Sequence, residues 1–209
     1  MGSFARLAFT PAVQAVQEAM GSRRAYDRAR LDGSQDSLGE IEQEFLAERD
    51  SFYMASIGET NWPYIQHRGG PKGFVRVLDE RTIAFADLRG NKQYISAGNV
   101  AGNDRVALIF VDYPQRARLK ILGHAQVVTQ ASDAALYERV AGSPGEGSAS
   151  RTERVFVIRV EGLDWNCPQH ITPRFTDIEI REMTQPLVDR VASLEKENAQ
   201  LREALARSR

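Results

Sequence analysis

The feature that most constrains the fold is a series of short β-rich segments between residues 51 and 163. Each segment is rich in β-branched and aromatic residues and is bounded by turn residues. Turns such as GETNWP and DERT are shorter than the dozen or more residues that a parallel crossover needs, so the strands are predicted to be mostly antiparallel. The segments are SFYMASI (51–57), PYIQHR (63–68), FVRVLD (74–79), TIAFAD (82–87), RVALIFVDY (105–113), RLKILGHAQVVT (118–129) and RVFVIRVEGL (154–163).

One of these segments shows the alternation of a strand with one buried face. An antiparallel sheet of six or seven strands must also hide its edges, which favours closure into a small barrel. We therefore expect a mainly β fold with flanking helices. The apolar face of the alternating segment carries Leu119, Ile121, Ala125 and Val127, and its polar face carries Arg118, Lys120, His124 and Gln126.

Helical patterns flank the β-rich region. A helix is predicted over residues 12–30, and a second one after a capping box formed by Ser37 and Glu40. The apolar face of the second helix would carry Leu38, Ile41, Phe45 and Leu46. A third helix over 132–142 would be capped by Ser132, and residues 143–153 read as a surface loop.

The C-terminal segment carries a heptad pattern, which we expect to start at Pro186. Asn198 falls at an a position between leucines at d, where asparagine commonly selects a parallel pair. A parallel partner would match the charges of Glu197 with Arg202 and of Arg190 with Glu195. A helix that folds back onto its own barrel would use the same stripe, and this alternative stays open. The stripe consists of Leu187, Val191, Leu194, Asn198, Leu201 and Leu205.

The expected organisation has three parts. Residues 1–50 form a helical segment that packs on the barrel, residues 51–182 form the barrel, and residues 183–209 form the heptad helix.

Composition excludes several classes of function. A net charge of −1 offers no global attraction for nucleic acid or for an acidic membrane. A single cysteine, Cys167, excludes an internal disulfide, and no apolar stretch approaches the length of a membrane span. With three histidines and no short spacing between them, we expect no metal site. We expect a cytoplasmic protein that binds neither nucleic acid nor membrane.

Polar donors gather at three strand boundaries: residues 66–73, residues 87–94 and the polar face of 118–124. Each combines arginine or lysine with glycine, which lets backbone N–H groups approach an anion closely. A phosphate site would explain this pattern, and solvated loops are the alternative. No Gly-x-Gly-x-x-Gly or Walker-type loop is present, so neither a Rossmann nor a P-loop site is predicted.

Four stretches in this order resemble the pyridoxamine 5'-phosphate oxidase-like family of FMN-binding split β-barrels. They are PYIQHRGGPKGF (63–74), IAFADLRGNKQYISAGN (83–99), NDRVALIFVDYPQRARLKILGHA (103–125) and WNCPQHI (165–171). The resemblance covers about residues 37–175 and excludes the heptad segment. It implies a split β-barrel and a homodimer with FMN at the subunit interface, acting on a small organic substrate.

The resemblance also implies a set of site residues. Lys92 takes the place of a phosphate-binding lysine, and Asn91 stands where the family has an arginine, so Arg68 or Arg89 would have to compensate. The family's substrate-binding arrangement is not matched, and only His170 and Arg174 lie nearby in the sequence. The candidate cofactor residues are Gln66, His67, Arg68, Ala86, Asp87, Arg89, Asn91, Lys92, Arg118 and Trp165.

Three hypotheses of function follow. The first is an FMN-dependent oxidoreductase, in which the cofactor carries the chemistry and the protein positions it. This would explain why no catalytic residue stands out. The second is a flavin- or haem-binding protein without turnover, and the third is a dimeric interaction module that uses the heptad helix.

Overall fold

The computed structural model describes residues 3–29, 36–142, 152–166 and 168–208. The predicted loop over 143–153 falls largely outside this part of the chain, and so does Cys167. The chain forms two compact units. The barrel unit spans residues 1–112 and 117–169, and the C-terminal unit consists of residues 113–116 and 170–209.

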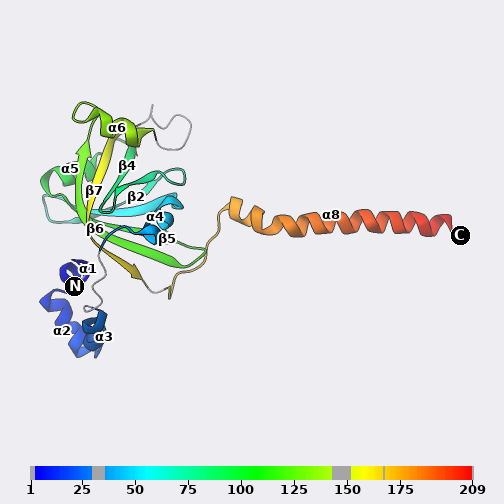
Figure 1. The fold of residues 1–209 in the computed structure, drawn as a ribbon, viewed down its shortest axis with the longest axis horizontal. Coiled ribbons are helices and arrows are strands. Elements are labelled where there is room, and N and C mark those ends of the chain that lie inside the picture. The colour runs from blue at the N-terminus through cyan, green and yellow to red at the C-terminus, as the bar shows by residue number, and fades with distance from the viewer. Residues whose placement is uncertain (1–2, 30–35, 143–151, 167, 209) are drawn as a thin grey trace. The chain divides into compact units, whose positions relative to one another are not determined.

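The barrel unit contains a seven-stranded sheet in the order β2-β1-β5-β6-β7-β4-β3 (Figure 1). Every neighbouring pair is antiparallel, as the short turns predicted. The last strand extends beyond its predicted bounds at both ends. The strands are β1 (Ser51–Ile57), β2 (Pro63–Gly69), β3 (Val75–Asp79), β4 (Thr82–Leu88), β5 (Arg105–Asp112), β6 (Ala117–Val128) and β7 (Thr152–Asn166).

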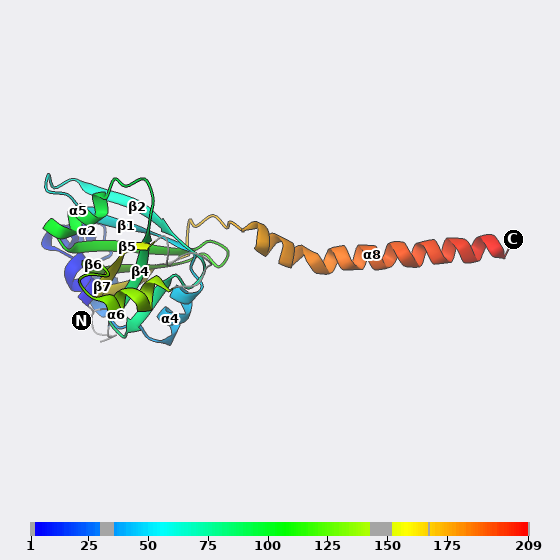
Figure 2. The same cartoon turned by 90° about the horizontal axis from the view of Figure 1, so that it is seen from above.

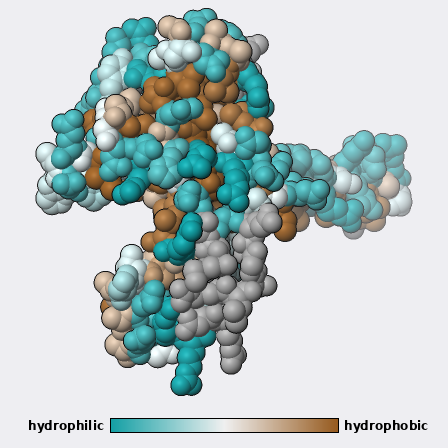
Figure 3. All heavy atoms as spheres, turned by 60° about the vertical axis from the view of Figure 1, so that its left-hand side comes forward, coloured by the Kyte–Doolittle hydropathy of each residue, from teal (hydrophilic) through white to brown (hydrophobic). Residues whose placement is uncertain are grey.

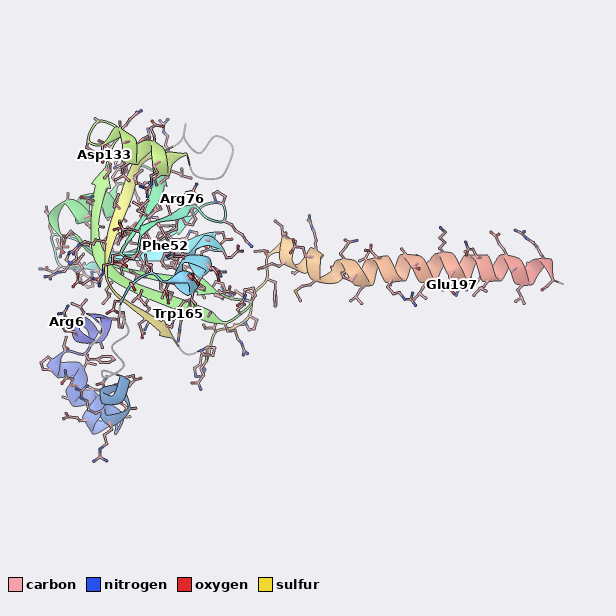
Figure 4. The ribbon with its side chains drawn as sticks, viewed as in Figure 1. Arg6, Phe52, Arg76, Asp133, Trp165 and Glu197 are labelled. Carbon is pink, nitrogen blue, oxygen red and sulfur yellow. The ribbon has the colours of Figure 1, made fainter. Side chains whose placement is uncertain are left out.

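The sheet curls around one aromatic core. Phe52 of β1 lies inside the barrel (Figure 4), and its ring centroid is 5.1 Å from that of Phe85 on β4. β1 and β4 stand four places apart in the strand order, so their side chains meet only because the sheet curls. The edge strands β2 and β3 are not paired with each other in the described chain. This open junction makes the structure the expected split β-barrel.

The alternation predicted for β6 is confirmed over most of its length. Leu119, Ile121 and Ala125 are buried, while Arg118 and Lys120 lie on the opposite face. The pairing of β6 with β7 shifts register between Leu122 and Gly123. Val127 is half-buried and packs against the same core, as predicted, whereas Val128 is buried in a second apolar cluster with Val140.

Three helices that follow the N-terminal region pack on the sheet. α4 (Glu40–Ala47) contacts β3, α6 (Ala134–Ala141) contacts β4 and β7, and α5 (Ile95–Gly102) contacts β1 and β6 (Figures 1 and 2). The structure corrects two predicted caps. Gly39 caps α4, with its N–H donating to Glu42 Oε2 at 3.0 Å. Asp133 caps α6 by accepting from the Leu136 N–H at 3.0 Å.

The predicted apolar face of α4 is correct only in part. Leu38 and Leu46 are buried and Phe45 packs against the core, but Ile41 is 70% exposed. The helix begins only at Glu40, so Ile41 lies in its first turn, on the outer side.

The N-terminal region consists of three short helices, α1 (Ser3–Ala8), α2 (Pro11–Ala19) and α3 (Arg23–Ala29). The single helix predicted over 12–30 is interrupted at Gly21, whose φ of 71° leaves the helical region. α1 packs on β7, where Asp36 Oδ1 accepts from the N–H groups of Phe4 at 3.4 Å and Leu163 at 3.1 Å. Buried Asp36 thus joins the N-terminal segment to the sheet.

The C-terminal unit is dominated by α8 (Asp177–Arg207), a helix of 31 residues without a buried residue. The prediction that it starts at Pro186 is wrong, because a capping box lies further upstream. Thr176 Oγ1 accepts from the Glu179 N–H at 3.2 Å, and Glu179 Oε2 accepts from the Thr176 N–H at 2.7 Å. Pro186 lies inside the helix and cannot donate to the carbonyl of Glu182. No helix in the described chain is long and apolar enough to cross a membrane.

Candidate functional site

Two adjoining hollows lie between β2 and the end of β4. The first offers a small ligand about 50 Å³ and the second about 180 Å³. They share Gln66, Arg68, Asp87 and Leu88, and Ala86 lines the second. The first is completed by the loop after β4, the start of α5 and Glu153 of β7, through Gly90, Asn91, Lys92, Tyr94, Ile95, Ser96, Ala97 and Glu153.

Strand register divides the side chains of β2 between the two faces of the sheet. Gln66 and Arg68 stand opposite Met54 and Phe52 of β1, whose side chains lie in the core, so both point to the inner side of the sheet. His67 also lines the second hollow, but it pairs with Tyr53, and its ring lies on the outer side, where the two ring centroids are 5.4 Å apart. The predicted group Gln66, His67 and Arg68 is therefore divided between two faces.

An ion-pair cluster closes the junction between β2 and β4. Arg68 Nη1 lies 2.5 Å from Asp87 Oδ1, and Arg154 Nε lies 3.4 Å from Oδ2 of the same carboxylate. Arg154 also donates from Nη2 to Glu153 Oε2 at 2.9 Å and stacks 4.4 Å above the ring of Tyr94. The side chains of Arg68, Asp87 and Arg154 are all less than 20% exposed.

Asp87 is thus a buried carboxylate between two guanidinium groups. Burial is the largest influence and raises the pKa of Asp87 above its ordinary value. The positive charges of Arg68 and Arg154 oppose this shift, and the charge of Glu153 adds to it. The arginines therefore offset only part of the cost of burying this carboxylate.

Arg68 retains a buried donor without an acceptor in this cluster, and so does Arg154 at Nε, among the described residues. The donor of Arg68 is also its Nε. Buried donors normally find an acceptor in the protein, in ordered water or in a ligand. The guanidinium carbon also lies 5.2 Å from the ring centroid of Phe156, so the group is held over the aromatic core. Arg68 can offer this Nε to an acceptor that enters the hollow.

The loop between β4 and α5 presents Lys92 and a helix N-terminus to the first hollow. Lys92 and Tyr94 adopt φ values of 60° and 53°, a left-handed conformation that is uncommon outside glycine and is enriched at ligand sites. The first N–H groups of a helix have no intrahelical acceptor, and Tyr94 offers no side-chain cap to α5. The ammonium group of Lys92 forms no ion pair with any described residue.

Hydrogen bonds fix α5 against the sheet. Ser96 is buried and donates to Gln66 Oε1 at 3.1 Å. Asn99 Nδ2 donates to Ser56 Oγ at 3.0 Å. The start of α5 is therefore tied to β2 and β1, and its N–H groups have a defined position beside the hollow.

The other predicted cofactor residues lie at the margin of the hollows or away from them. Asn91 lines the first hollow, but its amide bonds to Gln93 at 3.2 Å. Arg89 is largely exposed, with Nε 4.0 Å from Glu153 Oε1. Arg118 lies on the outer face of β6, opposite Val111, and lines neither hollow.

Trp165 also lies away from the hollows, at the end of β7 (Figure 4). It donates from Nε1 to Glu42 Oε1 at 2.7 Å and packs edge-on against Phe45 of α4.

The predicted substrate residues His170 and Arg174 belong to the C-terminal unit. Within that unit, the guanidinium of Arg174 lies 5.1 Å from the ring centroid of Tyr113. Their assignment to a substrate site stays a prediction.

Sequence reasoning missed Arg154, Glu153, Tyr94 and Ser96. Glu153 ends the predicted surface loop and Arg154 begins the last predicted strand, so nothing local marks either residue as part of a site. What brings Arg154 to the site is the pairing of β4 with β7, in which Asp87 stands directly opposite Arg154. The sequence does show an acidic residue, Asp87, at the end of one predicted strand and a basic residue, Arg154, at the start of another. Such a pair could have indicated that these two strands are neighbours.

No group of three or more His, Cys, Asp or Glu side chains in the described chain could hold a metal ion. The donors at the hollows are cations and N–H groups, which suit an anionic ligand.

Several solved structures are similar to this chain at low sequence identity. HupZ from Group A Streptococcus is 18% identical, with a TM-score of 0.48, over 66% of this chain and 99% of that chain. A Clostridium acetobutylicum protein, related to general stress protein 26 of B. subtilis, is 15% identical, with a TM-score of 0.44, over 67% and 94%. HutZ, the heme storage protein from Vibrio cholerae, is 16% identical, with a TM-score of 0.46, over 61% and 93%.

A search of curated proteins finds no match. The family model described as pyridoxamine 5'-phosphate oxidase matches residues 39–167, more than half of the chain. The chain therefore belongs to the pyridoxamine 5'-phosphate oxidase family.

Proposed function

We propose that the protein binds FMN, with the phosphate in the first hollow, and acts as an FMN-dependent oxidoreductase on a small organic substrate. The observation that carries this proposal is the meeting of Lys92, the N-terminus of α5 and Arg68 around one hollow. Family membership supports FMN as the ligand.

The donor set fits a phosphate group. Lys92 supplies a point charge, the first N–H groups of α5 supply hydrogen bonds together with the positive end of the helix dipole, and Arg68 Nε is a buried donor that lacks an acceptor. A phosphate oxygen is an acceptor of the kind that all three would satisfy.

Asn91 would have a structural role and not the phosphate-binding role of the family's arginine. Its amide bonds to Gln93 and shapes the loop that carries Lys92. Positive charge would come instead from Arg68, which Asp87 holds beside the hollow. Asp87 would keep this guanidinium oriented and would also lower the net positive charge that a phosphate meets.

The outer face of the sheet supports a homodimer with FMN at the subunit interface. A solvated sheet face normally carries polar residues at alternate positions. Here the outward positions carry Tyr53 and Ile65, which are exposed, and Ala55, Ala107 and Ile109, which are half-buried. Figure 3 shows apolar surface on one side of the barrel unit. A second barrel packed there would cover this face and could complete the site, since apolar patches of this kind mark interaction surfaces.

Bound FMN would supply two-electron transfer, and this chain would bind and orient it. Gln66, fixed by its bond to Ser96, would direct a polar group toward the ligand. Phe85 and Phe74 would line the second hollow with apolar surface and exclude water from it.

The absorption spectrum of the purified protein and a titration with FMN test this proposal. We expect flavin bands or tight binding, and reduction of the bound flavin by a nicotinamide donor. Bound flavin without turnover under any donor and acceptor pair would favour the non-catalytic binding protein instead. A colourless protein that does not bind FMN would overturn the proposal.

Lys92→Ala locates the phosphate. A charged hydrogen bond contributes about 1.5–3 kcal/mol, so we expect the FMN dissociation constant to rise by about tenfold or more. Lys72→Ala is the matched control, because Lys72 is exposed and pairs with Glu48 at 3.2 Å, away from the first hollow. An equal effect of both substitutions would remove Lys92 from the site.

A further inference from the structure

We propose that α8 forms a parallel, in-register coiled coil with the α8 helix of a second copy of this chain. This inference concerns the C-terminal unit alone and does not depend on flavin binding.

The apolar stripe of α8 is not covered by any described residue of its own C-terminal unit. Its apolar members run from Ile180 to Leu205, and their exposed fractions lie between 44% at Leu194 and 68% at Leu187. Because the helix begins at Asp177, the heptad frame extends one repeat beyond the segment that the sequence indicated. Ile180 falls at d and Thr184 at a in this added repeat, and Pro186 falls at c, which points away from the seam.

The charges beside the stripe have no partner in their own helix. Arg190 and Glu197 lie at g positions, while Glu195 and Arg202 lie at e positions. None of the four forms an ion pair within the described residues. The residues three and four places away from each of them carry no opposite charge, so pairing within the helix is excluded.

A second copy of the same helix supplies the missing charges. In a parallel pair, each g residue faces the e residue five places further along the partner. This spacing joins Arg190 to Glu195 and Glu197 to Arg202, and symmetry gives each pair twice. Glu197 lies on the exposed helix in Figure 4, where such a pair would form. If α8 instead folded onto its own barrel, the matching of charges between the g and e positions would have no structural explanation.

Asn198 decides between parallel and antiparallel pairing. An antiparallel pair could match the same charges, because Arg190 would face Glu197 and Glu195 would face Arg202. In that arrangement an a residue packs against d residues, which here are leucines, and the amide of Asn198 would be buried without an acceptor. In a parallel pair Asn198 meets Asn198 of the second copy, and the two amides bond to each other.

Cysteine cross-linking of the full chain tests the register. In a Cys167→Ser background, Leu201→Cys places a thiol at d, and Gln200→Cys places one at the outward c position of the same turn. Under a glutathione redox buffer we expect Leu201→Cys to form the 201–201 disulfide at least tenfold more than Gln200→Cys. Equal or negligible cross-linking of the two variants, with helix content unchanged by circular dichroism, would overturn the proposal.

Charge reversal provides a second test that needs no disulfide. Arg190→Glu should weaken self-association of the full chain in sedimentation, and adding Glu195→Arg should restore it. Adding Glu197→Arg instead should not restore it, because that pair meets only in an antiparallel coil. The parallel arrangement would be overturned if, in the Arg190→Glu background, Glu197→Arg restored self-association and Glu195→Arg did not, or if neither of them restored it.

Discussion

Replacing Arg68 with methionine tests whether the ion-pair cluster between β2 and β4 stabilises the barrel through charge. Methionine keeps an apolar chain over Phe85 and Phe156 but removes the guanidinium that lies 2.5 Å from Asp87. Breaking a buried pair by removing one partner costs about 3–5 kcal/mol. Asp87 keeps Arg154, with Nε at 3.4 Å, so we expect a loss of about 2–3 kcal/mol at neutral pH.

The pH dependence of this loss separates charge from packing. Burial already raises the pKa of Asp87, and removing Arg68 takes away the largest opposing influence, so the pKa rises further in the variant. A carboxyl group with a raised folded pKa contributes stability that is fully present below its unfolded pKa of about 3.9 and is lost as the pH rises through the folded pKa. The deficit of Arg68→Met should therefore shrink as the pH falls from neutral toward about 4.

Urea denaturation at several pH values measures the effect, and Lys120→Met is the matched control. Lys120 Nζ lies 3.8 Å from Asp164 Oδ2 at a site where both side chains are about 40% exposed. An exposed pair of this kind contributes less than about 1 kcal/mol. Equal losses for the two variants, or a deficit of Arg68→Met that does not change with pH, would refute the reasoning from buried charge.

Two further pairs of substitutions test other parts of the chain. Asn198→Leu should raise the melting temperature of the full chain, because it removes a buried amide pair from the coil, whereas Gln200→Leu at an outward position should not. Gly162→Ala should lower the free energy of unfolding by about 1–3 kcal/mol, because its Cβ would meet the backbone nitrogen of Phe4 at 2.5 Å. Gly98→Ala is the control, because an added Cβ on α5 would meet open space, and it should raise the free energy of unfolding by up to about 1 kcal/mol. If urea denaturation showed Gly162→Ala to be the more stable variant, the packing of α1 on β7 would be contradicted.

The bounds of the strands could be predicted closely from the sequence, because local turn signals mark where each strand begins and ends. Turn residues bound them, and the bounds of β1 match the predicted segment. Their antiparallel pairing follows from the short turns. Strand order does not follow in this way, because the pairing of β4 with β7 joins residues far apart in the chain and depends on the whole core.

The candidate site could be predicted only where it is local. The loop around Lys92 is visible as a cluster of polar residues and glycine after a strand, and Arg68 as a basic residue near the end of another. Arg154 enters through a long-range register, which a single sequence does not determine.

α5 was missed because Ile95–Gly102 contains two glycines and has weak helix propensity. Packing forms this helix instead, through buried Ser96 and Val100. Tertiary contacts therefore override local propensity at the element that places the N–H groups beside Lys92.

The position of Pro186 within α8 affects how two two-fold axes could be combined in a dimer. A pair of barrels and a pair of helices would each have a two-fold axis, and the two axes need not coincide. The carbonyl of Glu182 lacks the hydrogen bond that a residue other than proline would donate, so the helix bends more easily there than at any intact turn. The heptads beyond Pro186 can therefore take a direction of their own, and a mismatch between the two axes can be absorbed within one turn.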